Sequence, residues 1–77
     1  MVKGYVLVKL TLGFEASVLS QVRAIPGVRE VNLVFGHWDA IVIAEAKSLF
    51  ELVKIIVGEV RGIQGVGDTE TLMQGEL

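Results

Sequence analysis

Two short stretches with one pattern decide the fold: I-P-G-V at residues 25–28 and I-Q-G-V at residues 63–66. In each stretch the isoleucine closes a helical apolar pattern, and the glycine can adopt the positive φ of a tight turn. The valine then begins an extended segment. Pro26 presets the first turn, because its ring fixes φ and it cannot continue a helix. The two stretches therefore predict one helix-to-strand junction used twice, and with it two similar halves of the chain.

The first half is predicted to be strand, helix and strand. Residues 5–12 predict a strand with apolar side chains on both faces, and residues 28–35 alternate as in a strand with one more polar face. The segment between them has apolar residues three and four apart, which is the spacing of one helix face. These helical positions are Phe14, Val18, Val22 and Ile25.

The second half repeats this order. Residues 40–46 form a continuous apolar run that predicts a buried strand, and residues 65–74 predict a polar strand suited to a sheet edge. Between them Ser48 and Glu51 form a capping box, which predicts that a helix begins at Ser48. Gly58 within this helix suggests close packing. The predicted apolar stripe comprises Leu49, Leu52, Val53, Ile56, Val57 and Val60.

Two strand-helix-strand halves in succession predict an α+β, ferredoxin-like βαββαβ fold in a single domain over residues 1–77. The antiparallel four-stranded sheet would have its first and third strands in the middle and both helices on one face. The other face would stay open, and it would carry Tyr5 and Leu7. We expect a homodimer through this open face.

The composition supports association and excludes several classes of protein. Of the 77 residues, 52% are hydrophobic, which exceeds what one small core can bury. We expect a second copy of the chain to cover the remaining apolar surface. The longest apolar run, residues 40–44, is too short to span a bilayer, and no signal peptide is visible, so we expect a cytoplasmic protein without membrane contact. The chain has no cysteine and a net charge of −2. Its scattered basic residues do not suggest direct nucleic-acid binding.

The densest group of functional side chains is His37, Trp38 and Asp39. A histidine with an acid two residues later could act as a general base with its orienting partner. The interpretation that we favour is a hairpin loop, in which the aspartate binds turn amides and the tryptophan packs at an interface. One histidine cannot build a metal site alone, and no nucleotide-binding glycine motif is present, so no metal or cofactor is expected.

Thr69 and Thr71 lie on the same side of the last predicted strand. They could bind the carboxylate or amine of a ligand, although threonine is also a common strand residue without further function.

Three motifs in order resemble the effector-binding (RAM) domain of the Lrp/AsnC, or feast/famine, transcriptional regulators. They are I-P-G-V-x-x-V at residues 25–31, G-H-W-D-A-I-V at residues 36–42 and I-Q-G-V-G-D-T-E-T at residues 63–71. The resemblance covers essentially the whole chain. Because the first strand begins within the first few residues, the resemblance suggests a stand-alone RAM domain without the family's helix-turn-helix.

The resemblance implies a particular assembly and site. Such domains pair through their sheets, the dimers assemble into rings, often octamers, and an amino-acid effector binds between dimers. The implied ligand-binding residues are Gly36, His37, Trp38 and Asp39 in the loop, with Thr69 and Thr71 from a neighbouring subunit. The implied function is amino-acid sensing related to transcription regulation, without enzymatic activity, in which full-length Lrp/AsnC-type regulators are further partners.

Three other functions fit the same pattern. The chain could be a structural partner that co-assembles with regulators and binds no ligand. It could be a small enzyme of the dimeric α+β-barrel type that uses His37, although no second base accompanies that histidine. ACT domains also bind amino acids on this fold, but the G-x-x-D loop and the threonine pair match the RAM domain better.

Overall fold

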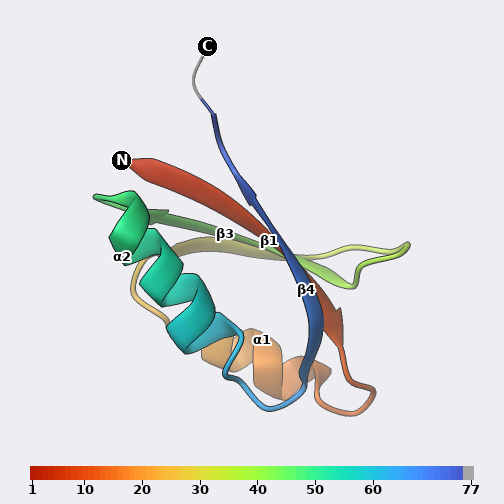
Figure 1. The fold of residues 1–77 in the computed structure, drawn as a ribbon. Helices are drawn as coiled ribbons and strands as arrows, with labels where there is room; N and C mark the ends of the chain where they lie inside the picture. The colour runs from red at the N-terminus through yellow and green to blue at the C-terminus, as the bar shows by residue number, and fades with distance from the viewer. Residues whose placement is uncertain (76–77) are drawn as a thin grey trace.

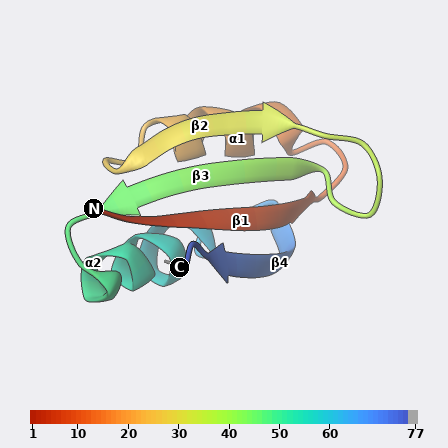
Figure 2. The same ribbon diagram turned by 90° about the horizontal axis from the view of Figure 1, so that it is seen from above.

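A computed structural model describes residues 1–75 and contains one four-stranded antiparallel sheet with strand order β2-β3-β1-β4. Both helices cover the same face of the sheet (Figure 1), and the opposite face is uncovered (Figure 2). This arrangement confirms the predicted ferredoxin-like fold, including the central position of β1 and β3. The elements are β1 (Val2–Leu10), α1 (Glu15–Arg23), β2 (Val28–Leu33), β3 (Ala40–Ala46), α2 (Leu49–Val53), η1 (Lys54–Val60) and β4 (Val66–Met73).

The two helix-to-strand junctions have the same geometry. Gly27 and Gly65 have φ values of 98° and 102°, and in each turn the valine amide donates to the isoleucine carbonyl oxygen at 3.1 Å. The Gly27 carbonyl accepts from the Glu45 amide at 2.8 Å, and the Gly65 carbonyl accepts from the Thr11 amide at 2.8 Å. Each turn is therefore bonded to the other half of the chain, the first to β3 and the second to the residue after β1, which confirms that one device is used twice.

The core lies between the sheet and the two helices. Every second residue of β1 and β3 faces it, and α1 contributes Val18, Leu19 and Val22. Because valine and alanine fill most sheet positions, the helices lie close to the strands. The largest side chains that are less than 2% exposed are those of Leu52, Val6, Val8, Val18, Val22, Val42 and Val60.

The second helix begins where the sequence predicts, since the Ser48 hydroxyl accepts from the Glu51 amide at 3.1 Å. The predicted single apolar stripe is wrong in part. Only Leu52, Ile56 and Val60 of the predicted stripe are buried. The other three predicted members lie on a flank of the helix and are 40–55% exposed: Leu49, Val53 and Val57.

The reason is a change of helical winding at Lys54. From that residue the segment is a π-helix, η1, which has more residues per turn than the α-helix before it. With this wider winding the six apolar residues divide into a buried set (Leu52, Ile56 and Val60) and an exposed set (Leu49, Val53 and Val57). Gly58 also differs from expectation, because a methyl group there would meet nothing within 4 Å.

The connection between β2 and β3 is longer than predicted. Strand β2 ends at Leu33, so the loop comprises residues 34–39 instead of residues 36–39. Phe35, predicted as a strand residue, is in the loop and fully exposed.

The uncovered face of the sheet is apolar at its centre. The register pairs Tyr5 with Ile43 and Leu7 with Ile41, and β4 adds Leu72 beside Tyr5. These side chains are only half-covered by their neighbours. No helix within residues 1–75 is both long enough and apolar enough to cross a bilayer.

Candidate functional site

Asp39 fixes the predicted ligand loop to the sheet. Its carboxylate oxygen Oδ2 accepts from the Leu10 amide at 2.9 Å, and its own amide donates to the Val8 carbonyl at 2.9 Å. Its carbonyl accepts from the Val34 amide at 3.0 Å, which closes the loop. Asp39 is therefore hydrogen-bonded to both the end of β1 and the start of the loop, and it positions the loop. The sequence predicted that this aspartate binds turn amides, but not which ones.

The tip of this loop presents an aromatic pair. The rings of His37 and Trp38 are T-shaped, with centroids 5.0 Å apart and planes at 88°. The histidine is exposed and the tryptophan is half-buried. Gly36 before them has a φ of 142°, a conformation that side chains disfavour. The loop therefore holds the His37 and Trp38 side chains in a defined arrangement at the surface.

A hollow of about 350 Å³ lies beside Asp39. It is bounded by the end of β1, the start of α1 and the β2–β3 loop. Of the predicted site residues only Asp39 lines it, while Gly36, His37 and Trp38 do not. The lining consists of Leu10, Leu12, Glu15, Leu33, Val34, Phe35 and Asp39.

Most of these lining residues were not predicted as site residues. One sequence feature could have identified two of them. Leu12 and Phe35 are apolar residues next to turn-forming glycines, at positions where no strand or helix buries them. Because the strand was predicted to extend through Phe35, that side chain was assigned to a strand face.

Thr69 and Thr71 lie away from the loop within one chain. On β4 they pair with Val8 and Val6 of β1, which are buried under the helices, so they share the helix-covered side of the sheet, as the predicted alternation requires. Val8 pairs in turn with Ala40, the residue after Asp39. Two strand spacings, about 10 Å, therefore separate the threonine row from the loop side of the sheet. One copy of the chain does not bring the two predicted halves of the site together.

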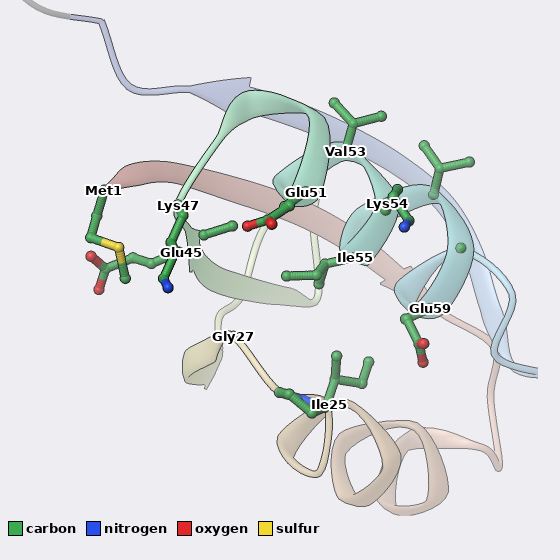
Figure 3. A pocket seen from close by; sticks show the side chains of 14 residues that line it. Met1, Ile25, Gly27, Glu45, Lys47, Glu51, Val53, Lys54, Ile55 and Glu59 are labelled. Atoms are coloured by element: carbon green, nitrogen blue, oxygen red, sulfur yellow. The ribbon is translucent and has the colours of Figure 1, made fainter.

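A larger groove of about 940 Å³ lies between the second helix and the turn at Gly27 (Figure 3). Ile55 reaches toward Gly27, where an added methyl group would lie 2.7 Å from the Ile55 Cδ1 atom. Both acidic and basic side chains line it, including Lys47, Glu51 and Glu59. None of the residues predicted from the sequence as ligand-binding lines this groove.

Charged side chains are sparsely paired. The one ion pair within residues 1–75 joins the Arg29 Nε atom to the Glu45 Oε1 atom at 3.5 Å, on the β2 side of the sheet. Among those same residues no group of three metal-ligating side chains comes together, and no buried side-chain polar atom lacks a hydrogen-bond partner.

Comparisons with known proteins agree on one family. The Lrp/AsnC ligand binding domain family matches residues 3–74. An uncharacterized HTH-type transcriptional regulator of Pyrococcus horikoshii is 39% identical over 59 residues, which are 77% of this chain and 39% of the regulator. The chain thus spans about two fifths of the length of the curated relatives that it matches.

Solved structures share the fold. The crystal structure of FFRP-DM1 superposes with a TM-score of 0.91 at 30% identity, covering 96% of this chain and 99% of that one. A transcriptional regulator of Neisseria meningitidis, solved as a complex with L-Met, has a TM-score of 0.85 at 16% identity. That match covers 97% of this chain and 50% of the regulator, and it shows likeness of fold alone.

Proposed function

This chain belongs to the Lrp/AsnC ligand-binding domain family, and on that premise we propose that it binds an amino-acid effector within an assembly of several copies. Its curated relatives are HTH-type transcriptional regulators, so the proposed role is sensing for transcription regulation. The Neisseria meningitidis regulator with this fold binds L-Met, which supports an amino acid as the ligand class.

The observation that carries the proposal is the clamp at Asp39. A half-buried carboxylate bonded to the Leu10 amide holds a six-residue loop beside a hollow of about 350 Å³. Small-ligand pockets occupy about 300–1,000 Å³, so this hollow suits a single small molecule. One carboxylate oxygen of Asp39 is used by the clamp, and the other is free to accept from an ammonium group.

The ligand site is proposed to be completed by a second copy. In each copy Thr69 and Thr71 lie on an edge strand that pairs only with β1, so their row is accessible from the side of the sheet. Their hydroxyl groups can donate to a carboxylate. A neighbouring copy that brings this edge to the loop would place ammonium- and carboxylate-binding groups on opposite sides of one ligand.

The copies are proposed to dimerise through the open sheet face before forming a ring. The centre of that face is apolar, with Leu7 and Ile41 paired across β1 and β3. Burying such side chains contributes about 25 cal/mol per Å² of apolar surface. A face-to-face dimer leaves the loop and the β4 edge at its periphery, where dimers can meet.

A catalytic role is not part of the proposal. His37 is exposed, and its side-chain contact is the edge-to-face stacking with Trp38. The nearby Asp39 carboxylate binds the Leu10 amide instead of the imidazole.

The single tryptophan of the chain, Trp38, provides the test. We expect one or a few of the twenty amino acids to change its fluorescence and to raise the melting temperature. Asp39→Asn, which removes the charge but keeps an acceptor for the Leu10 amide, should weaken this binding. Glu51→Gln makes the same charge change on the second helix and should not. If no amino acid binds to a correctly assembled wild-type protein, the proposed function is wrong.

A further inference from the structure

The hollow beside Asp39 combines apolar walls with negative charge alone. Its two ionisable lining residues, Glu15 and Asp39, are both acids, and every other lining residue is apolar. We infer that the effector is an α-amino acid with an apolar side chain, whose ammonium group is held by these two carboxylates. The inference rests on the proposed function and narrows its ligand class.

The two carboxylates are fixed before a ligand arrives. The Glu15 Oε1 atom accepts from the Gly13 amide at 2.9 Å, and the Asp39 Oδ2 atom accepts from the Leu10 amide at 2.9 Å. Each acid is thus anchored through one oxygen, and neither forms an ion pair within the described part of the chain. A positive group bound between them gains two charge-assisted interactions without ordering long side chains. An acidic ligand side chain in the same place is repelled.

The apolar walls of the hollow favour a ligand whose side chain is apolar. Leu12, Leu33 and Phe35 are 90%, 57% and 102% exposed, so the apolar surface around the hollow is in contact with water. A ligand side chain that covers them is favoured in proportion to its own apolar area. A polar or charged side chain gains no hydrogen bond from these walls and loses its own hydration.

The volume of the hollow limits the size of the ligand. The main-chain amides of the loop can bind the ligand's α-carboxylate. At about 350 Å³ the hollow is at the small end of ligand pockets, which suits one amino acid better than a peptide or nucleotide. The main-chain amides of residues 35–38 donate no main-chain hydrogen bond among residues 1–75. Phe35 lines the hollow and residues 36–38 continue the same loop, so these amides can donate to the α-carboxylate together with the threonines of a second copy.

The first experiment compares ligands by calorimetry and Trp38 fluorescence. The probes are L-leucine, L-phenylalanine, L-aspartate, L-lysine and N-acetyl-L-leucine. We expect L-leucine or L-phenylalanine to bind at least about tenfold more tightly than L-aspartate or L-lysine. N-acetyl-L-leucine keeps the apolar side chain but lacks the ammonium group, and it should bind at least about tenfold more weakly than L-leucine.

The second experiment compares matched variants. Glu15→Gln keeps an acceptor for the Gly13 amide and should weaken L-leucine binding about tenfold, whereas Glu51→Gln should leave it unchanged. Leu33→Asn should weaken it by a similar factor. Leu49→Asn is its control, because Leu49 is 55% exposed and lies on the second helix, away from the hollow. Circular dichroism confirms that each variant is folded.

The outcomes separate the inference from the function on which it rests. Preferential binding of L-aspartate or L-lysine, or equal binding of N-acetyl-L-leucine and L-leucine, overturns the inference and leaves amino-acid sensing intact. Unchanged affinity in both Glu15→Gln and Leu33→Asn overturns the placement in this hollow. Absence of binding by any amino acid overturns both proposals.

Discussion

At the scale of single residues, the junction glycines decide whether the chain can turn from helix to strand. Gly27 and Gly65 have the same positive φ, but their surroundings differ. A methyl group on Gly27 would lie 2.7 Å from the flexible end of Ile55 and 3.0 Å from the Glu45 carbonyl oxygen, whereas on Gly65 it would lie 2.5 Å from the Cβ atom of Phe14. A Cβ atom cannot rotate away, so the second turn tolerates a side chain less well than the first.

These surroundings predict a ranking of three glycine-to-alanine variants. Gly65→Ala should lower the free energy of unfolding most, and Gly27→Ala should lower it by about 1–2 kcal/mol from its positive φ alone. Gly58→Ala should raise it by about 0.5–1 kcal/mol, because that helical position is open. Urea unfolding at one protein concentration measures all three, and equal losses at positions 27 and 65 would contradict the steric argument.

Asp39 has a structural role that can be separated from ligand binding. Asp39→Ala leaves the part-buried Leu10 amide without its acceptor and should cost about 1–3 kcal/mol of unfolding free energy. Asp39→Asn retains an acceptor oxygen and should cost clearly less. Thermal unfolding without ligand measures the difference. Equal stability of the two variants would show that the clamp does not hold the loop.

The sequence predicted the polar contacts of such residues only where they are local. The bond from the Glu51 amide to Ser48 spans three residues and follows from a known pattern. The bond from the Leu10 amide to Asp39 spans 29 residues and depends on the strand register. An aspartate in a hairpin loop predicts some bond to an amide, but only the fold determines which one.

At the scale of elements, the second helix shows where periodicity misleads. Six apolar residues at helical spacing predict one stripe, whereas the change from α2 to η1 places three of them in the core and three on the surface. A π-helical segment has no reliable sequence signature, so this division could not be predicted. The strands were predicted more accurately, because alternation gives their faces directly.

The division predicts a large loss of stability for one truncation and a small loss for the truncation next to it. Leu52 is fully buried against Gly4 of β1, and Leu52→Ala should lower the free energy of unfolding by about 2–5 kcal/mol. Val53 is 40% exposed, and Val53→Ala should cost less than about 1 kcal/mol. Denaturant unfolding compares them. A loss at Val53 as large as that at Leu52 would mean that the exposed row is covered in solution.

At the scale of the whole molecule, the sequence predicted the architecture well, whereas the predicted ligand-binding residues remain a proposal. The repeated junction and the apolar central strands gave the correct strand order, since both are properties of the chain itself. The hollow beside Asp39 depends on how the end of β1, the start of α1 and the β2–β3 loop lie relative to one another. No local sequence pattern predicts that arrangement. The predicted threonine half of the site remains a proposal, because its position relative to the loop depends on a second copy.

The open sheet face yields the last prediction, which concerns association. Leu7 lies at the centre of that face, between Ile41 on β3 and Glu70 on β4. In a face-to-face dimer, Leu7→Glu would bury a carboxylate without a partner, and the attraction of two such faces would not offset its desolvation. Within one copy the position is only half-buried, so the variant should still fold.

We therefore expect Leu7→Glu to reduce the mass measured by light scattering to half or less of the wild-type assembly, with an unchanged circular dichroism spectrum. Gln21→Glu is the matched control, since it introduces the same charge on the exposed side of α1. If both variants keep the wild-type mass, the sheet face is not the interface. If the wild-type chain is itself monomeric at all concentrations, no site shared between copies can form, because the loop and the threonine row of one chain stay two strands apart.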